Sequence, residues 1–380
     1  MILFRSQLNQ NDSRDYSETY TTTINGNIEK GSCAKMFAGN IEFNSNVVVG
    51  NNVNSCFSMF DGCINFNATV ELPNSVTNCV NMFRSCEKLN KIVNIPNSVE
   101  NCYSMFQGCY NFNKDVVIPS ETLSCVYMFS QCHELNQNIQ LLNKNIYYSY
   151  MFNGCYSLNQ NICIPENVFL ISSMFQDCTS LNQNILLHDN VVCSALFHNC
   201  SSLNQNIKVP NTNSAHKMFA NCTNLNQSIE ISEDVQNCTY MFMHCTSLNK
   251  PIVVPKNCKN MYSMFYGCTN LNSPITILSD SLNSSGMLNC FGNCDNFSSN
   301  IYIKNNINTY MMFGYIYNTA SIKRRNIISP YIEYIKTLYM FVNYNSYDNS
   351  GTYIRPSYTA MTNGYYNTYW NIYLYNNYPT

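Results

Sequence analysis

Cysteine is the most reactive residue type that recurs in this chain, which has 21 cysteines in 380 residues. Cysteine side chains form disulfides and bind zinc, and both kinds of site need defined spacings. No Cys-x-x-Cys pair occurs, and the pair Cys290 and Cys294 has no second pair or nearby histidine to complete a tetrahedral site. The sequence therefore predicts no metal site and no cofactor.

Most of the cysteines recur at a regular spacing. A free cysteine in a repeated slot behaves as a small buried hydrophobe, and the odd total argues against a complete set of disulfides. We expect reduced cysteines in the core of a protein that folds in a reducing cytoplasm. The first column contains Cys63, Cys86, Cys109, Cys132, Cys155, Cys178, Cys200, Cys222, Cys245, Cys268 and Cys294, and the second contains Cys33, Cys56, Cys79, Cys102, Cys125, Cys193 and Cys238.

Histidines and acids are the other candidates for catalysis. No phosphate-binding glycine loop, serine nucleophile motif or His-Glu-x-x-His motif is present. The acids are sparse, and the five histidines do not share a repeat position. We therefore expect that the protein is not an enzyme. The histidines are His133, His188, His198, His216 and His244.

A repeat of about 23 residues positions these side chains. Its clearest mark is a Met-Phe pair, or Leu-Phe in one copy, and two degenerate copies follow near Cys290 and Met312. Self-similarity at this period predicts a stack of thirteen repeats over residues 33–316. The clear copies start at Met36, Met59, Met82, Met105, Met128, Met151, Met174, Leu196, Met218, Met241 and Met264, with a spacing of 23 residues except for two of 22.

The repeat at residues 151–173 shows the expected elements when its methionine is numbered position 0. Ile162 and Ile164, at positions 11 and 13, alternate with polar neighbours, which predicts a short strand with one buried face. The spacing of Met151 and Cys155 favours a single helical or 3₁₀ turn. One such coil buries its apolar face only by stacking, so we expect a solenoid with a parallel strand ladder.

The unit Met-Phe-x-Gly-Cys-x-x-Leu-Asn-x-x-Ile-x-Ile-Pro resembles the BspA-like leucine-rich repeat of bacterial and protist surface proteins. Residues 158–162 and 181–185 also resemble a related bacterial surface-protein repeat. Methionine stands here where BspA-like repeats often have alanine. The resemblance covers about residues 33–316. It implies a leucine-rich-repeat solenoid, α/β or mainly β, with helical or 3₁₀ turns on its convex side, and a role in adhesion and protein binding.

The two ends of the chain lack the motif. Residues 1–32 are polar and are expected to cap the first repeat, because repeat stacks need polar ends. Residues 317–380 are rich in tyrosine and asparagine, and their alternation of aromatic and polar residues predicts strands. This segment is either a C-terminal cap or a docking segment that forms oligomers. Its candidate assembly residues are Tyr365, Tyr366, Tyr369, Trp370 and Tyr373.

An asparagine follows position 7 in eleven repeats. An amide both donates and accepts hydrogen bonds, so stacked asparagines can satisfy backbone groups and one another. We interpret this column, at position 8, as mainly structural. It contains Asn44, Asn67, Asn90, Asn113, Asn136, Asn159, Asn182, Asn204, Asn226, Asn249 and Asn272.

Outward residues of the predicted strand form the candidate binding face. Position 9 is glutamine in five consecutive repeats, position 10 is often asparagine, and position 12 varies. This amide strip suits a glycan or a polar peptide, although a hydrogen-bonded ladder without a ligand explains it as well. The candidate residues are Gln137, Asn138, Gln140, Gln160, Asn161, Gln183, Asn184, Leu186, Gln205, Asn206 and Gln227.

Composition limits the class of partner. The net charge is −2 and only 11% of residues are charged, which gives no reason to expect nucleic acid. No apolar run could span a bilayer, and no Sec signal is visible at the start. We expect a non-enzymatic binding or assembly protein, first as an exposed structural or attachment component of a phage or viral particle. The alternatives are a bacterial cell-surface adhesin and an intracellular protein-binding scaffold, with a protein or glycan partner in each case.

Overall fold

The structure is a computed structural model that describes part of the chain. Within the described residues it contains ten strands and no helix, and so no helix that could cross a membrane. The chain divides into two compact units, Met1–Ile185 and Leu186–Thr380, called here the N-terminal and the C-terminal unit. The described residues are 21–24, 31–141, 147–283, 286–304, 307, 312–313, 315–316, 325–328, 342–343 and 370–373.

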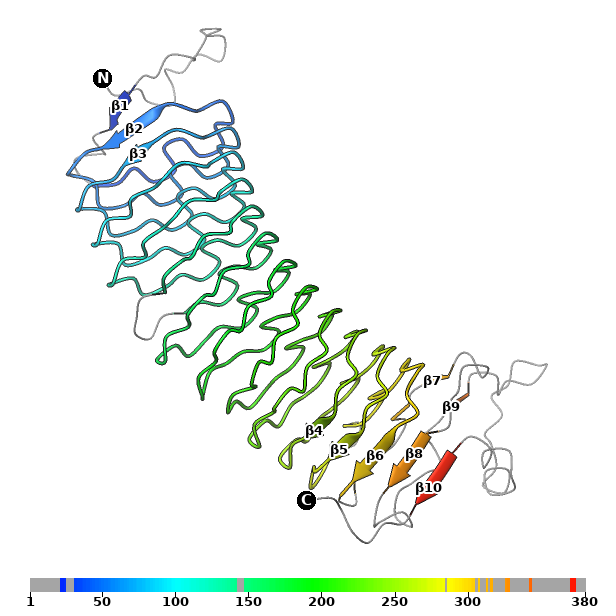
Figure 1. The fold of residues 1–380 in the computed structure, drawn as a ribbon. Helices are drawn as coiled ribbons and strands as arrows, with labels where there is room; N and C mark the ends of the chain where they lie inside the picture. Colours follow the sequence, from blue (N-terminus) through cyan, green and yellow to red (C-terminus); the bar gives the residue numbers. More distant parts are fainter. Residues whose placement is uncertain are drawn as a thin grey trace, which may run out of the picture. The chain divides into compact units, whose positions relative to one another are not determined.

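The N-terminal unit begins with a three-stranded parallel sheet in the order β1-β2-β3 (Figure 1). Val47 and Val49 of β2 are buried while Asn46 and Val48 are partly exposed, as expected for a strand with one buried face. β1 belongs to the expected N-terminal cap, so the parallel ladder extends into that segment. The strands are β1 (Thr21–Ile24), β2 (Asn46–Val49) and β3 (Val70–Glu71).

The C-terminal unit contains a five-stranded parallel sheet in the order β10-β8-β6-β5-β4, and β7 pairs with β9 in parallel (Figure 1). β8 and β10 come from the segment 317–380, so the sheet continues beyond the end of the recognisable repeats. Most of that segment lies outside the described residues. The strands are β4 (Ile252–Val254), β5 (Ile275–Ile277), β6 (Asn300–Ile303), β7 (Tyr315–Ile316), β8 (Arg325–Ile328), β9 (Val342–Asn343) and β10 (Trp370–Tyr373).

The segment around each Met-Phe pair is a series of turns, and the helical or 3₁₀ turn expected there is not found among the described residues. Successive backbone amides donate in turn to a carbonyl of their own repeat and to a carbonyl of the next repeat. The amide of Cys63 donates to Phe60 O three residues earlier at 2.9 Å, whereas the amide of Phe60 donates to Met82 O of the next repeat at 2.9 Å. A continuous helix would use every amide within the repeat. The alternation instead sends every second amide across to the neighbouring coil.

This alternation requires unusual backbone angles at two positions of each repeat. The residue before the methionine and the residue at position 3 have positive φ, as in Ser58 (51°) and Gly62 (75°). Glycine suits position 3 because it has no Cβ, yet Gln131 adopts the same conformation at 63°. The hydrogen bonds between repeats therefore hold the backbone in this conformation even at residues with long side chains.

The core is built from columns of identical side chains. Met59, Phe60 and Cys63 are fully buried, and their counterparts in the following repeats are buried in the same way. The phenylalanine rings stack from one repeat to the next, with 5.4 Å between the ring centroids of Phe60 and Phe83 and an interplanar angle of 1°. Each buried phenylalanine contributes roughly 1.5–3 kcal/mol through loss of apolar surface to water. Stacking thus buries the face that a single coil would leave exposed.

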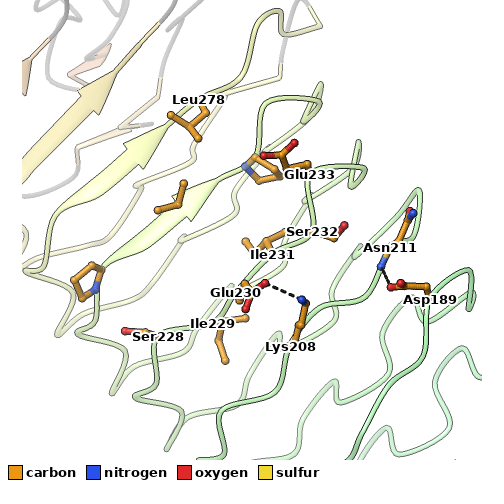
Figure 2. A pocket seen from close by; sticks show the side chains of 13 residues that line it. Asp189, Lys208, Asn211, Ser228, Ile229, Glu230, Ile231, Ser232, Glu233 and Leu278 are labelled. Carbon is orange, nitrogen blue, oxygen red and sulfur yellow. Dashed lines mark hydrogen bonds and ion pairs between the residues drawn. The ribbon is translucent and has the colours of Figure 1, made fainter. Parts of the chain in front are cut away.

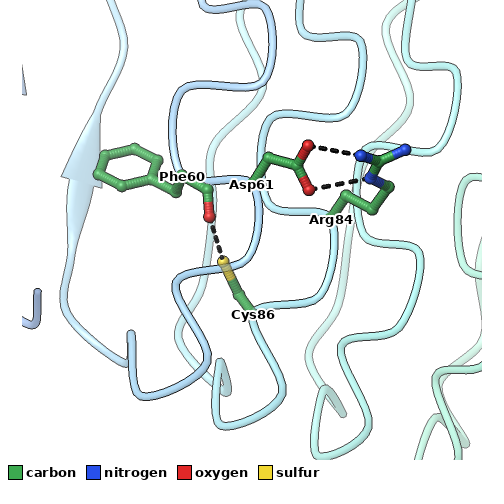
Figure 3. Close-up of polar contacts among 4 residues, drawn as sticks. All are labelled: Phe60, Asp61, Arg84 and Cys86. Carbon is green, nitrogen blue, oxygen red and sulfur yellow. Dashed lines mark hydrogen bonds and ion pairs between the residues drawn. The ribbon is translucent and has the colours of Figure 1, made fainter. Parts of the chain in front are cut away.

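The cysteine column at position 4 also forms hydrogen bonds. The thiol of Cys86 donates to Phe60 O at 3.1 Å (Figure 3), and Phe60 O accepts the amide of Cys63 with its other lone pair. The other bonds of this kind join Cys63 to Phe37, Cys109 to Phe83, Cys132 to Phe106, Cys155 to Phe129, Cys178 to Phe152, Cys222 to Phe197, Cys245 to Phe219, Cys268 to Phe242 and Cys294 to Phe265.

No disulfide joins any of the 21 cysteines, all of which lie in the described part of the chain, and all except Cys163 are buried, as expected for core columns. Burial raises the pKa of the Cys33 thiol to about 11 and that of the Cys56 thiol to about 12. These groups are protonated at neutral pH. They act as small apolar side chains with one hydrogen to donate, because the charged thiolate would be poorly solvated in the core.

The asparagine column at position 8 is a ladder of side-chain-to-backbone hydrogen bonds. Asn113 Oδ1 accepts the amide of Asn136 at 3.0 Å, and Asn136 Oδ1 accepts the amide of Asn159 at 2.9 Å. The same bond recurs in the C-terminal unit, where Asn226 Oδ1 accepts the amide of Asn249 at 2.9 Å. The structural role inferred from the sequence is confirmed by these bonds.

The strand at positions 11–13 is less regular than expected. The alternation of burial is general, since Val116 and Ile118 are buried while Val117 between them is 72% exposed. Between β3 and β4, however, no strand forms among the described residues. In two of these repeats the amide at position 11 donates to a carbonyl of its own repeat. The amide of Ile139 donates to Gln137 O at 3.1 Å, and the amide of Ile207 donates to Gln205 O at 3.0 Å. This tight turn removes the amide from a ladder with the next repeat.

Candidate functional site

The predicted amide strip has two kinds of residue. The glutamines at position 9 are half-buried, and the side chains of four of them bond to the asparagine ladder of the preceding repeat. Gln137 Nε2 donates to Asn113 Oδ1 at 2.9 Å, and Gln160 Nε2 donates to Asn136 Oδ1 at 3.1 Å. Gln183 and Gln227 bond in the same manner. These glutamines therefore reinforce the scaffold, and their role in ligand binding stays a prediction.

The remaining residues of the strip are more accessible. Gln140 and the asparagines at position 10 are exposed, and the side chain of Leu186 is 71% exposed. The strip is divided between the two units, with Leu186, Gln205, Asn206 and Gln227 in the C-terminal unit. The exposed asparagines are Asn138, Asn161, Asn184 and Asn206.

A groove of about 630 Å³ lies in the C-terminal unit (Figure 2). Its lining comes from the outward strand positions and the following corner of five consecutive repeats, which begin at residues 174, 196, 218, 241 and 264. None of the residues of the predicted strip lines it. The lining consists of Asp189, Lys208, Asn211, Ser228, Ile229, Glu230, Ile231, Ser232, Glu233, Pro251, Val253, Pro255 and Leu278.

One part of the groove is charged. Lys208 Nζ lies 2.9 Å from Glu230 Oε1, and the hydrogen bond that the ammonium group donates to this carboxylate raises the pKa of the lysine. Asp189 Oδ1 accepts the amide of Asn211 at 2.8 Å, which fixes the carboxylate at the corner. Glu233 is exposed and forms no ion pair with a described residue. The lining therefore contains three carboxylates and one ammonium group, and it is net negative.

The other part of the groove is apolar. Pro251, Val253, Pro255 and Leu278 line it, and the side chain of Val253 is 49% exposed. Figure 2 shows Leu278 at the opposite end from Asp189. The nearby Lys256 is paired with Asp280 at 3.4 Å, so it adds little positive charge to this end. No aromatic ring is among the lining residues.

The groove forms where the length of the repeat changes. The repeats that begin at residues 174 and 196 have 22 residues, and both supply residues to the groove. In the 23-residue repeats the corner closes with a turn, as from Val235 N to Ser232 O at 3.3 Å. In the first of the shorter repeats Asn190 instead has positive φ (64°), and its amide donates to Asn211 O at 2.7 Å. The shorter corner thus lies beside a longer one.

The other candidates from the sequence do not add a site. Tyr365, Tyr366 and Tyr369 lie outside the described residues, and only the backbone of Trp370 and Tyr373 is described, as part of β10. Within the described part of the chain, no group of three or more histidine, cysteine or acidic side chains is placed to hold a metal ion.

Sequence reasoning missed the groove although two signals pointed to it. One was the pair of 22-residue spacings among eleven regular copies. The other was the variation at position 12, which includes Lys208, Glu230 and Val253. The prediction rested instead on the regular glutamines, whose side chains bond to the asparagine ladder.

Comparisons with known proteins address the family and the fold. A leucine-rich repeat protein from Bacteroides ovatus is 16% identical, with a TM-score of 0.48 over 87% of this chain and 93% of that protein. A leucine-rich cell surface protein from Faecalibacterium prausnitzii is 19% identical, with a TM-score of 0.48 over 79% of each chain. A comparison with curated proteins found no significant match.

The family described as "Mycoplasma protein of unknown function, DUF285" matches residues 31–140, 119–191 and 191–306. These tandem segments cover most of the repeats recognised in the sequence. The membership of a repeat family that the sequence predicted is confirmed by this match. The chain belongs to this family, DUF285.

Proposed function

We propose that this protein is a non-enzymatic binding protein whose stacked repeats display a surface for a macromolecular ligand. The groove between Asp189 and Leu278 is the ligand site in this proposal. The observation that carries it is the contrast between constant and variable positions. Core columns of methionine, phenylalanine and cysteine repeat with little change, whereas the groove changes from charged to apolar within a few repeats.

Shape supports the same proposal. The groove is shallow and extends over several repeats, which suits an elongated ligand better than a small substrate, for which enclosed pockets are typical. All the cysteines except Cys163 are buried, and burial raises the pKa of thiols such as those of Cys33 and Cys56. A reactive cysteine needs an accessible thiolate, so the core columns favour a structural role.

Three biological settings were expected from the sequence: a virion, a cell surface and an intracellular scaffold. Each of them would use such a surface. Neither the fold nor the family match supports the virion, and that role stays a prediction. The proposal therefore concerns the binding surface itself, and membership of a repeat family is compatible with many ligands.

Two exposed valines at the same repeat position give a matched test. Val253 lies in the groove and is 49% exposed, whereas Val117 lies in the N-terminal unit and is 72% exposed. The full chain would be screened against a displayed random-peptide library and a glycan array. We expect saturable ligands whose binding falls at least about tenfold for Val253→Arg, roughly 1.4 kcal/mol, and is unchanged for Val117→Arg.

The melting temperature of each variant would show that the fold is retained. Ligands that bind both variants as well as the parent chain would place the site elsewhere and contradict the proposal. A screen without any saturable ligand would contradict it as well.

A further inference from the structure

We infer that the occupant of the groove is an extended polypeptide segment with basic residues at one end and apolar residues at the other. This inference rests on the proposed function and narrows its ligand to one class. Three features of the groove support this inference: the arrangement of its charged and apolar surface, its length, and the absence of aromatic side chains from its lining.

The negative charge of the groove favours a ligand with basic residues at one end. Asp189 and Glu233 are two carboxylates for which the lining provides no cation beyond Lys208, which lies 2.9 Å from Glu230. A ligand with arginine side chains would complement this field, because the guanidinium group donates two parallel hydrogen bonds to a carboxylate. An acidic ligand would meet like charge here, which disfavours binding.

The apolar end selects the rest of the segment. This end of the groove is lined by the apolar side chains of Pro251, Val253 and Leu278, which form no hydrogen bonds with a ligand. A leucine or valine side chain placed there would remove apolar surface from water on both sides of the contact. Pyranose rings bind best against the face of an aromatic side chain through their C–H groups, and the lining contains no aromatic ring, so a polypeptide is favoured over a glycan.

The length of the groove sets the length of the segment. Its lining residues span four steps between adjacent repeats, and a step of about 4.8 Å gives roughly 19 Å. An extended chain advances about 3.3 Å per residue, so about six residues would fill the groove. The segment would run across the strand direction and be recognised through its side chains.

The test uses a labelled six-residue peptide with two arginines at one end, a leucine-valine pair at the other and a serine-glycine centre. Both orders of the ends would be made, because the groove does not define the direction of the chain. We expect the better order to bind the full protein, and its arginine-to-glutamate version to bind at least about fivefold more weakly. Raising the sodium chloride concentration from 50 to 500 mM should weaken the arginine peptide severalfold.

Charge exchange provides the decisive control. Glu233→Arg should weaken binding of the arginine peptide and strengthen binding of the glutamate peptide. Val253→Arg should weaken binding of the arginine peptide, while Val117→Arg should change the binding of neither peptide. These variants alter exposed side chains, and equal melting temperatures would show that they fold.

The possible failures are distinguishable. If the glutamate peptide binds as well as the arginine peptide and Val253→Arg weakens both, the groove binds ligands but the inferred class is wrong. A glycan whose binding depends on Val253 would likewise overturn the inference while the proposed function stands. If the arginine peptide binds equally to all variants, or no order of it binds at millimolar concentration, the inference is overturned.

Discussion

At the scale of single residues, one departure from a core column leaves a polar atom unsatisfied. Tyr148 occupies the slot that Cys125 fills one repeat earlier, and its side chain is fully buried. Its hydroxyl has no hydrogen-bond partner among the described residues, and burial raises its pKa well above the usual range. A buried hydroxyl without a partner destabilises the folded state because it loses its bonds to water.

Replacing this hydroxyl should therefore stabilise the protein. We expect Tyr148→Phe to raise the free energy of unfolding by about 1 kcal/mol, since it removes the unsatisfied group and keeps the ring. Tyr148→Ala should lower that free energy by roughly 3 kcal/mol or more, because it leaves a cavity. Denaturant titration measures both changes. A loss of stability in Tyr148→Phe would show that the hydroxyl is hydrogen-bonded in solution.

The cysteine columns predict a selective pattern of thiol chemistry. Iodoacetamide reacts with thiolates, and burial holds the pKa of Cys33 near 11 and that of Cys56 near 12. In the folded protein at pH 8, we expect rapid labelling of Cys163 alone, and at pH 9.5 the buried columns should still be protected. Unfolding in guanidinium should expose all 21 thiols.

Mass spectrometry of the labelled protein checks this pattern, and Cys163→Ser should remove the native label. Rapid modification of the cysteines at position 4 below pH 9.5 would contradict the closed core.

At the scale of structural elements, the asparagine ladder joins neighbouring repeats outside the core. Asn136 Oδ1 accepts both the amide of Asn159 and the side chain of Gln160. Asn136→Leu should lower the free energy of unfolding by about 0.5–1.5 kcal/mol, because both hydrogen bonds to Asn136 Oδ1 would be lost. The exposed Asn138 provides the control, and Asn138→Leu should change stability by less than about 0.5 kcal/mol. Equal effects of the two variants in thermal unfolding would refute the ladder.

Elements that depend on side-chain periodicity were predictable from the sequence. The two buried positions of the strand, the core cysteines and the role of the asparagines all follow from spacing, because identical side chains must stack in identical slots. The local backbone was not predictable in the same way. Met151 and Cys155 have a helical spacing, yet the amides around them alternate between their own repeat and the next. Spacing reports which side chains share a face, and hydrogen bonding between coils decides the backbone path.

At the scale of the whole molecule, each unit combines a constant interior with a variable exterior. The family could be inferred from the sequence because eleven copies of the repeat agree, and the total of thirteen repeats stays a prediction. The groove could not, because it depends on how a 22-residue corner packs beside a 23-residue corner. Residues such as Asp189 and Leu278 are 89 positions apart in the sequence, and only the stacking of repeats brings them to one surface.

The binding surface is the central claim, and hydrogen–deuterium exchange on the full chain tests it most directly. Exchange would be measured with and without the two-arginine peptide at saturating concentration. The predicted result is slower exchange in fragments that cover residues 208–233 and 252–278. Protection confined to residues 137–140, 160–163 and 183–186 would instead identify the glutamine and asparagine strip as the ligand site, and would contradict the groove.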